Sequence, residues 1–398
     1  MAVVDGQNET FRYKRLLELA GLFFRLGAVA FGGPAAHISM FREEVVRRRQ
    51  WIDDRRFLDL LGATSLIPGP NSTEMAIHIG FERARWAGLV VAGVCFILPA
   101  FVFVTGLTWV YVEFGQHLVV AGILYGIKPV VIAVVAKAIT GLSGVAFRRP
   151  RQVVIAVAAL GLYLGGTNEI LLMFGSGLFG VLFTWIRPRI GGGLTVVAPL
   201  MGLTQTLPGI ALTIPATFSL ASLFLVFLKI GAVLYGSGYV LVTFLERDLV
   251  DRLGWLTQPQ LLDVIAIGQV TPGPVFTTAT AIGYVMGGLP GAAVATVGIF
   301  LPSFLFVAMV NPLITYLRSN TMASAFLDGV NAGAIALMAG VALTLGRAAI
   351  VDAPSAVVGL GAAYLLVRRG VSPTWLIPVA AVIGVSCQWG LGIVSGGL

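Results

Sequence analysis

Charged residues are scarce in this sequence. Only 11% of its 398 residues are Asp, Glu, Lys or Arg, whereas soluble domains carry about 25%. The mean hydropathy is +0.93, and 57% of the residues are hydrophobic. These values exclude an ordinary soluble domain and indicate a membrane protein.

Cysteine and histidine are also rare, which limits the chemistry that the chain can perform. Cys95 and Cys387 lie in apolar runs without a CxxC spacing, and His37, His78 and His117 share no ligand spacing. These patterns indicate neither a disulfide framework nor a metal site. The GxxxxGK[ST], HExxH and GxSxG motifs are absent, so we expect no ATP hydrolysis, no enzymatic activity and no cofactor.

Apolar runs are what the sequence has in abundance. At about 20 residues per crossing, the runs long enough to span a bilayer are Trp86–Val112, Leu118–Phe147, Ile210–Phe244, Gly283–Val310 and Ala323–Leu345. Shorter runs that we expect to cross as well are Val153–Leu164, Ile170–Ile186, Ser355–Val367 and Trp375–Val394. The sequence therefore predicts an all-α polytopic membrane protein with about 10–13 crossings, embedded in the lipid bilayer.

The net charge of +8 comes mostly from Lys and Arg in the short loops between these runs. Positive residues collect in cytoplasmic loops of membrane proteins, so we interpret the charge as a topology signal and expect no nucleic-acid partner. The polar segment Met1–Arg15 does not resemble a cleavable signal peptide.

Two Pro-Gly-Pro motifs interrupt the apolar sequence, at Pro68-Gly69-Pro70 and at Pro272-Gly273-Pro274. Each proline lacks a backbone N–H and disfavours helical geometry in the preceding residue. Within a bilayer, broken backbone survives only where protein or a water-filled cavity satisfies the freed groups. We therefore predict that each motif breaks a re-entrant hairpin, and that the two together mark a transport site.

The two motifs belong to a duplication of the whole chain. At a separation of 204 residues, Arg25 aligns with Lys229 and Trp51 with Trp255, and the two Pro-Gly-Pro motifs coincide. The sequence predicts a first repeat at residues 12–190, a linker at 191–209 and a second repeat at 210–398.

The charges favour inverted repeats. The loop Arg42–Arg56 holds six arginines, whereas its copy Glu246–Gln260 keeps two and adds acidic residues. By the positive-inside rule the first loop is cytoplasmic and its copy lies on the other side.

The segment Phe31–Ile38, with Gly32-Gly33-Pro34 at its centre, the Pro-Gly-Pro motifs and the duplicated halves together resemble the long, two-domain form of the chromate ion transporter family. The resemblance covers essentially the whole chain. It implies export of chromate across a bacterial-type inner membrane, with sulfate as a related oxyanion that competes or substitutes. It also makes Gly32-Gly33-Pro34 and the two Pro-Gly-Pro motifs candidate gating elements. The second copy departs from the pattern, because Leu241 replaces His37.

Chromate and sulfate are tetrahedral dianions, and helix N-termini offer such ions unpaired N–H groups and positive potential. The half-helices that follow the Pro-Gly-Pro motifs supply the candidate binding residues Asn71, Ser72, Thr73, Thr277 and Thr278. The alternative is that these residues only cap their helices and that the motif is a packing kink.

Arg25 and Lys229 are the sharpest pair of candidate binding residues. Each is a cation deep in an apolar helix, where a charge costs a few kcal/mol or more and by default marks a pathway. The alternatives are snorkelling to the interface, or a salt bridge from Arg25 to Glu18 or Glu74.

Other polar residues in apolar sequence are secondary candidates. Lys128 and Gln269 are candidate ligands of the oxyanion. Glu74 and His78 lie at i and i+4 on one helix face, so that they, with His37, are candidates for proton coupling. The alternative is that Glu74 and His78 pair with Arg25.

The mechanism that we predict is secondary export driven by the membrane potential, with proton coupling as an addition. A dianion leaving a negative-inside cell gains about 4.6 kcal/mol per 100 mV, twice the value for one charge. The alternatives are a sulfate or oxyanion uptake symporter and, less favoured, an anion channel. The sequence does not determine the oligomeric state, and a homodimer is one option.

Overall fold

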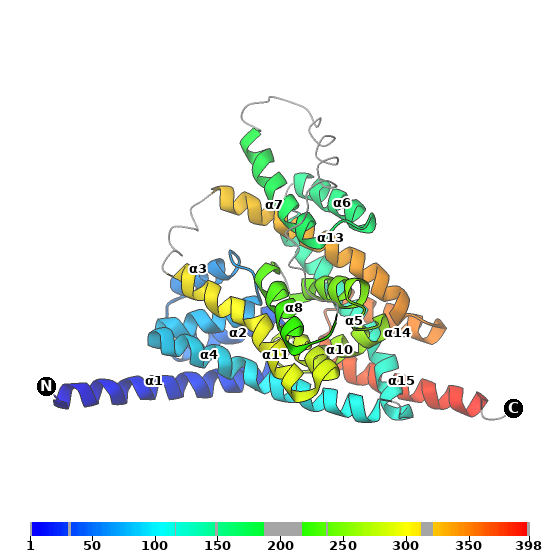
Figure 1. Ribbon diagram of the computed structural model, residues 1–398, viewed down its shortest axis with the longest axis horizontal. Coiled ribbons are helices and arrows are strands. Elements are labelled where there is room, and N and C mark those ends of the chain that lie inside the picture. The colour runs from blue at the N-terminus through cyan, green and yellow to red at the C-terminus, as the bar shows by residue number, and fades with distance from the viewer. Residues whose placement is uncertain are drawn as a thin grey trace.

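The computed structural model describes residues 2–30, 33–115, 117–147, 150–186, 217–235, 238–311 and 321–395. Over these residues the regular structure is entirely helical (Figure 1). Gly32 and the predicted linker 191–209 lie outside the described residues. The helices long and apolar enough to cross a membrane within this part of the chain are Asn71–Phe114, Leu118–Gly144, Val275–Val310 and Met322–Ala349. Shorter apolar helices accompany them. The protein is therefore an all-α, multi-pass membrane protein.

The amino-terminal helices begin and end at residues whose chemistry favours helix ends. The helix α1 (Ala2–Val29) ends just before the Gly-Gly-Pro motif, and α2 (Pro34–Arg42) starts with its proline in the first turn, where the missing N–H costs nothing. A wider helical turn, η1 (Glu43–Arg48), extends α2. The side chain of Asp53 accepts a hydrogen bond from the backbone N–H of Arg56 and caps α3 (Asp54–Thr64).

The helix α4 (Asn71–Phe114) begins directly after the first Pro-Gly-Pro motif and contains a sharp turn. Ala84 and Arg85 have non-helical backbone angles. Gly80 and Gly88 lie so close that a Cβ atom on Gly80 would come within 2.2 Å of the Gly88 carbonyl oxygen. Because residues eight apart in a straight helix are about 12 Å apart, the chain turns back on itself here. The sequence predicted this division into a half-helix and a span.

A second long helix, α11 (Thr278–Val310), repeats this geometry after the other Pro-Gly-Pro motif. Its turn lies at Gly287 and Gly288. A Cβ atom on Gly283 would come within 2.3 Å of the Gly291 carbonyl oxygen. The short turn η5 (Val275–Thr277) precedes α11, and α10 (Gln258–Val270) leads into the motif.

The apolar run Ile210–Phe244, of which residues 210–216 and 236–237 lie outside the described residues, is not one continuous helix. The helix α8 (Leu220–Val233) ends at Leu234, which has extended backbone angles. After a break the chain continues as η3 (Gly238–Val240), α9 (Leu241–Leu245) and η4 (Glu246–Arg252). Gly238 follows Gly236 and Ser237 in the sequence, a pair that lies outside the described residues. Glycines disfavour a helix interior, so high hydropathy did not suffice to keep this run helical.

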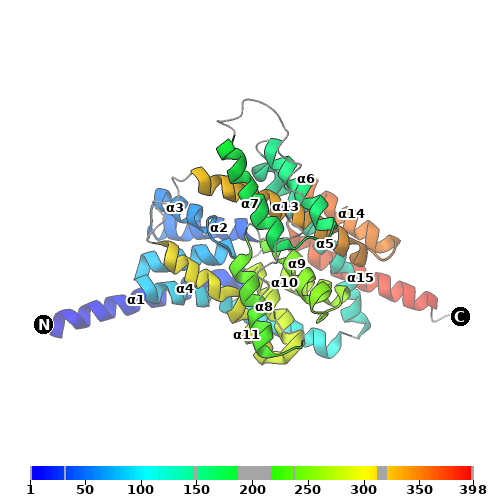
Figure 2. The same cartoon turned by 45° about the horizontal axis from the view of Figure 1, so that its top comes forward.

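The other helices pack in pairs and groups around the central elements (Figures 1 and 2). The helix α5 packs against α14 and α15, and α13 packs against α6 and α7. Their bounds are α5 (Leu118–Ala146), α6 (Pro150–Leu164), α7 (Glu169–Ile186), α13 (Thr321–Ala349), α14 (Ala353–Arg368) and α15 (Pro373–Ser395). Each of these contacts joins a helix from the first half of the chain to a helix from the second half.

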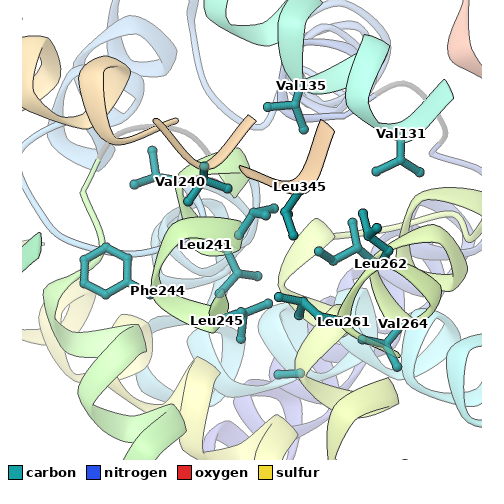
Figure 3. Close-up of a cluster of buried hydrophobic side chains, with 14 of the residues drawn as sticks. Val131, Val135, Val240, Leu241, Phe244, Leu245, Leu261, Leu262, Val264 and Leu345 are labelled. Atoms are coloured by element: carbon teal, nitrogen blue, oxygen red, sulfur yellow. The ribbon is translucent and has the colours of Figure 1, made fainter. Parts of the chain in front are cut away.

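The buried core contains side chains from both halves of the chain (Figure 3). Helices α9 and α10 lie at its centre, with α5 and α13 packed against them. The residues labelled in this view are Val131, Val135, Val240, Leu241, Phe244, Leu245, Leu261, Leu262, Val264 and Leu345. The core thus fixes α10, and with it the start of the second Pro-Gly-Pro loop.

Candidate functional site

The two Pro-Gly-Pro loops bond to the opposite halves of the chain. The Gly69 N–H donates to the carbonyl oxygen of Leu234 at 2.8 Å, and the Gly273 N–H donates to that of Ala30 at 3.0 Å. Leu234 follows the last residue of α8, and Ala30 follows the last residue of α1. Each loop therefore satisfies a carbonyl that helix termination leaves free, and protein groups satisfy the broken backbone as predicted.

Both central glycines are packed too tightly for a side chain. Their φ angles are positive, 137° for Gly69 and 96° for Gly273. A Cβ atom on Gly69 would lie 2.2 Å from a carboxylate oxygen of Glu74, and one on Gly273 would lie 2.7 Å from the Cβ atom of Ala100. The flanking prolines Pro68, Pro70, Pro272 and Pro274 fix the approach of the chain on either side.

A cavity of about 260 Å³ lies beside the second loop. The residues that line it include Ala30 and Gly33 from the first half, Gln269 from the end of α10, Gly273 from the second loop and Thr374 from the start of α15; the others are Tyr239, Gly268, Val270, Thr271, Val275, Pro373, Ile377 and Pro378. None of these lining residues has a charged side chain. The cavity is thus polar through neutral groups.

Several of these neutral groups can donate hydrogen bonds into the cavity. The side-chain nitrogen of Gln269 is buried and has no hydrogen-bond partner. Thr374 lies in the first turn of α15. Its hydroxyl accepts from the Ser372 hydroxyl at 3.0 Å and keeps its own proton as a donor, whereas its backbone N–H donates to Ser372. The hydroxyl of Tyr239 lies next to Gly33, since a Cβ atom there would be 3.3 Å from it. The sequence predicted Gln269 and Gly33 as functional residues but not Tyr239 and Thr374. The proline at the start of α15 could have indicated the helix N-terminus that contains Thr374.

The predicted helix-terminal residues lie next to the loops but do not line this cavity. Ser72, Thr73, Thr277 and Thr278 are buried, and Asn71 is partly exposed. The Thr277 hydroxyl donates to Pro274 at 2.7 Å, and that of Thr278 to Val275 at 2.9 Å. These two hydroxyls therefore serve their own helical turns, as in the capping alternative. The Thr73 hydroxyl is buried without a hydrogen-bond partner.

Arg25 and Lys229 form matched ion pairs. Arg25 contacts Glu44 at 2.6 Å, and Lys229 contacts Asp248 at 2.5 Å. The acceptors, like the cations, are 204 residues apart in the sequence. Neither predicted partner of Arg25 is used, because Glu18 pairs with Arg83 at 2.8 Å. The exposed fraction of the side chain is 54% for Arg25 and 9% for Lys229.

Arg25 also lines a larger pocket of about 620 Å³ between α1, α2 and η1. Glu44, outside the candidate spans, lies at its wall and accepts from three guanidinium groups: those of Arg25, Arg48 and Arg49. Burial works against ionisation of this carboxyl, but the hydrogen bonds from Arg25 and Arg49 and the nearby positive charges outweigh it. The pKa of Glu44 therefore lies below its ordinary value.

Glu74, His78 and His37 are all buried, and none of them contacts Arg25. Glu74 lies beside the Ser303 hydroxyl and His78 beside Asn311. A ring nitrogen of His37 lies 2.9 Å from the carbonyl oxygen of Ala30, the same atom that accepts from Gly273. His37 thus holds the end of α1 against the second loop.

Lys128 lies away from the cavity, in a buried contact between helices. It pairs with Asp263 on α10 at 2.8 Å, and Tyr111 on α4 donates to the same carboxylate at 3.1 Å. This contact ties the helix that leads into the second loop to both α4 and α5. No group of three or more His, Cys, Asp or Glu residues that could hold a metal ion occurs in the described ranges.

Comparison with known proteins gives a consistent picture. The sequence model of the family described as Chromate transporter matches residues 17–181 and again residues 221–385. The chain is 31% identical over 394 residues to the chromate transport protein of Cupriavidus metallidurans, covering 96% of this chain and 95% of that protein. It is 32% identical over 358 residues to the chromate transport protein of Pseudomonas aeruginosa, covering 86% and 84% of the two chains. No solved structure matches.

Proposed function

This chain belongs to the chromate transporter family, and on that premise we propose that it is a secondary transporter that exports chromate across a bacterial-type inner membrane. The observation that carries the proposal is the uncharged cavity beside the cross-bonded loops. Gln269 and the Thr374 hydroxyl present neutral donors to it. Neutral donors can bind a tetrahedral dianion and still release it, because no opposite charge holds it.

We propose that the two halves are inverted repeats that rock against each other around this cavity. Three pairs of features separated by 203 or 204 residues support the proposal. They are the loop glycines with their exchanged hydrogen bonds, the Arg25 and Lys229 ion pairs, and the turns within α4 and α11. Broken helices at the interface of such repeats are the usual binding place in secondary transporters.

The membrane potential is sufficient to drive export under this proposal. A dianion that leaves a negative-inside cell gains about 4.6 kcal/mol per 100 mV, which supports roughly a thousandfold gradient. Import of sulfate, the alternative direction, needs a coupling ion to overcome the same energy.

Proton coupling, where it occurs, is best assigned to Glu74. Its carboxylate is fully buried against Gly69 of the first loop and Ser303 of α11. It has no ion pair with any cation in the described residues. A buried carboxyl without a cation costs far less free energy as the neutral acid than as the anion. We therefore propose that Glu74, rather than His37 or His78, carries the proton.

The test is chromate flux from proteoliposomes with an imposed potassium diffusion potential. Export predicts that an inside-negative potential speeds loss of chromate and that an inside-positive potential slows it. Gln269→Ala should lower the flux about tenfold or more, because one buried donor is lost. Gly141→Ala is the control, since nothing lies within 4 Å of its Cβ position. Flux indifferent to the potential contradicts electrogenic export, and a single-channel conductance identifies a channel instead.

Glu74→Gln separates proton coupling from the rest of the proposal. The amide keeps the shape of the side chain and cannot release a proton. We expect the variant to respond to the membrane potential as the wild type does and to lose any response to a pH gradient. A variant that still responds to the gradient excludes Glu74 as the coupling residue.

A further inference from the structure

The pocket at Arg25 is a separate chamber from the uncharged cavity, although the two meet at one point of the fold. Val29 lines the pocket and the next residue, Ala30, lines the cavity. The pocket has a volume of about 620 Å³ and is lined by four arginines against two glutamates. It is therefore a strongly positive space next to the end of α1.

Glu44 occupies the place in this pocket where an anion would bind. Its contacts are 2.6 Å to Arg25, 3.2 Å to Arg48 and 3.3 Å to Arg49. Several charge-assisted hydrogen bonds from guanidinium groups are what a tetrahedral oxyanion needs. Glu43 also contacts Arg48, at 3.3 Å, so the three guanidiniums carry one positive charge more than the two glutamates beside them.

The matched cluster in the second half has two cations around its carboxylate instead of three. Asp248 pairs with Lys229 at 2.5 Å and lies 3.7 Å from Arg252, while Leu253 takes the place of Arg49. Only 2% of the Asp248 side chain is exposed. This pair is thus closed to solvent, which makes it the control for the open cluster.

We propose that Arg25, Arg48 and Arg49 form an outer binding site for a tetrahedral dianion, with Glu44 as the counter-ion that the dianion displaces. The proposal rests on the proposed function and extends it to the place where the anion is first captured. An anion of charge −2 competes with a carboxylate of charge −1 for the same donors. When Glu44 returns to these donors it displaces the anion. Binding at the outer site is therefore weak enough for the anion to be released toward the inner cavity.

The first test measures equilibrium binding of chromate and of sulfate to the purified full-length protein in phosphatidylcholine nanodiscs. Glu44→Gln removes the competing charge with little change of shape. We expect about tenfold tighter binding of the dianion, the effect of one charge-assisted contact. Asp248→Asn should give no such gain. The gain should persist in the double variant Glu44→Gln, Gln269→Ala, because the inner cavity is a different site.

A second measurement does not depend on the folding of the Glu44 variant. Ser39 lines the pocket and is exposed. In a chain with Cys95 and Cys387 replaced by serine, Ser39→Cys should react rapidly with a negatively charged thiol reagent. Millimolar sulfate should slow that reaction several-fold.

Three outcomes overturn the proposal. They are unchanged affinity in Glu44→Gln, absence of protection by sulfate, and a gain that appears only when the nanodiscs contain phosphatidylglycerol. In the last case an anionic lipid headgroup occupies the pocket. If the wild type shows no chromate flux but Glu44→Gln still binds the dianion more tightly, the transport proposal is contradicted and the outer site is supported.

Discussion

Single residues decide the geometry of the central loops, and Gly69 and Gly273 show this most clearly. Both have positive φ angles and both have atoms of other elements within 2.7 Å of the position of a Cβ atom. The same glycines donate the hydrogen bonds that join the halves. Backbone conformation, packing and bonding thus all require glycine at these positions.

Replacing either glycine by alanine should destabilise the protein. For Gly273→Ala we expect a loss of about 1–3 kcal/mol, because the new methyl group meets Ala100 and the left-handed conformation is strained. Thermal unfolding in detergent is the measurement, with Gly141→Ala as the control, since nothing lies within 4 Å of its Cβ position. Equal midpoints for the two variants would contradict the packing described for the loop.

Lys128 provides a second prediction for a single residue. Lys128→Met leaves Asp263 buried without its cation, which should cost about 3–5 kcal/mol. The double variant Lys128→Met, Asp263→Asn should recover much of that loss, because the uncompensated charge is gone. A thermodynamic cycle from unfolding midpoints checks this. Additive effects of the two substitutions would show that the 2.8 Å contact contributes little.

Among the elements, the sharp turns of α4 and α11 share one backbone geometry but have different residues. Arg85 has φ 55° and ψ −140°, and Gly288 has φ 61° and ψ −152°. Glycine adopts this conformation without strain, whereas a residue with a side chain does not. The first half therefore retains strain that the second half avoids.

Substitutions at the two turns should act in opposite directions. Arg85→Gly should stabilise the protein or leave it unchanged, because relief of strain competes with loss of the contact between Arg85 and the Phe81 ring. Gly288→Ala should destabilise it by about 1–3 kcal/mol. Unfolding midpoints under identical conditions give both values, and Gly106→Ala, in an open position of α4, is the control. Destabilisation by Arg85→Gly as large as that by Gly288→Ala would contradict the assignment of strain.

Elements were more predictable from the sequence than the contacts between them. The breaks at the Pro-Gly-Pro motifs and the start of α4 at Asn71 follow from local chemistry and are confirmed. The run Ile210–Phe244 does not form one helix, because hydropathy alone does not predict the helix end at Leu234. The partners of Arg25 and Lys128 are far away in the sequence, and no local pattern points to Glu44 or Asp263. Tyr239 was missed for the same reason, whereas the proline at the start of α15 was a local signal that could have pointed to Thr374.

Across the whole molecule, the matched ion pairs differ in access. The Arg25 side chain is 54% exposed at a large pocket, whereas that of Lys229 is 9% exposed. Tyr163 accepts a hydrogen bond from Arg247 next to the second cluster, and the Glu169 carboxyl lies close to Lys229 and Asp248. The helices α6 and α7 thus cover one pair and leave the other open.

This asymmetry predicts a difference in chemical reactivity. In a chain without Cys95 and Cys387, Arg25→Cys should react with a small thiol reagent at least about tenfold faster than Lys229→Cys, since modification requires access to the thiolate. Rates measured on the folded protein in detergent check this. Equal rates would indicate that both clusters are open in solution.

The exchange of hydrogen bonds at Gly69 and Gly273 also has a consequence for biosynthesis. The acceptor for the first loop is Leu234, which leaves the ribosome only after the whole first half has been made. Until then the Gly69 N–H lacks its native acceptor, and the amino-terminal segment inserts as an unfinished intermediate. The two halves therefore reach their final structure together, late in synthesis. A chain truncated before Leu234 should be degraded by quality-control proteases rather than accumulate.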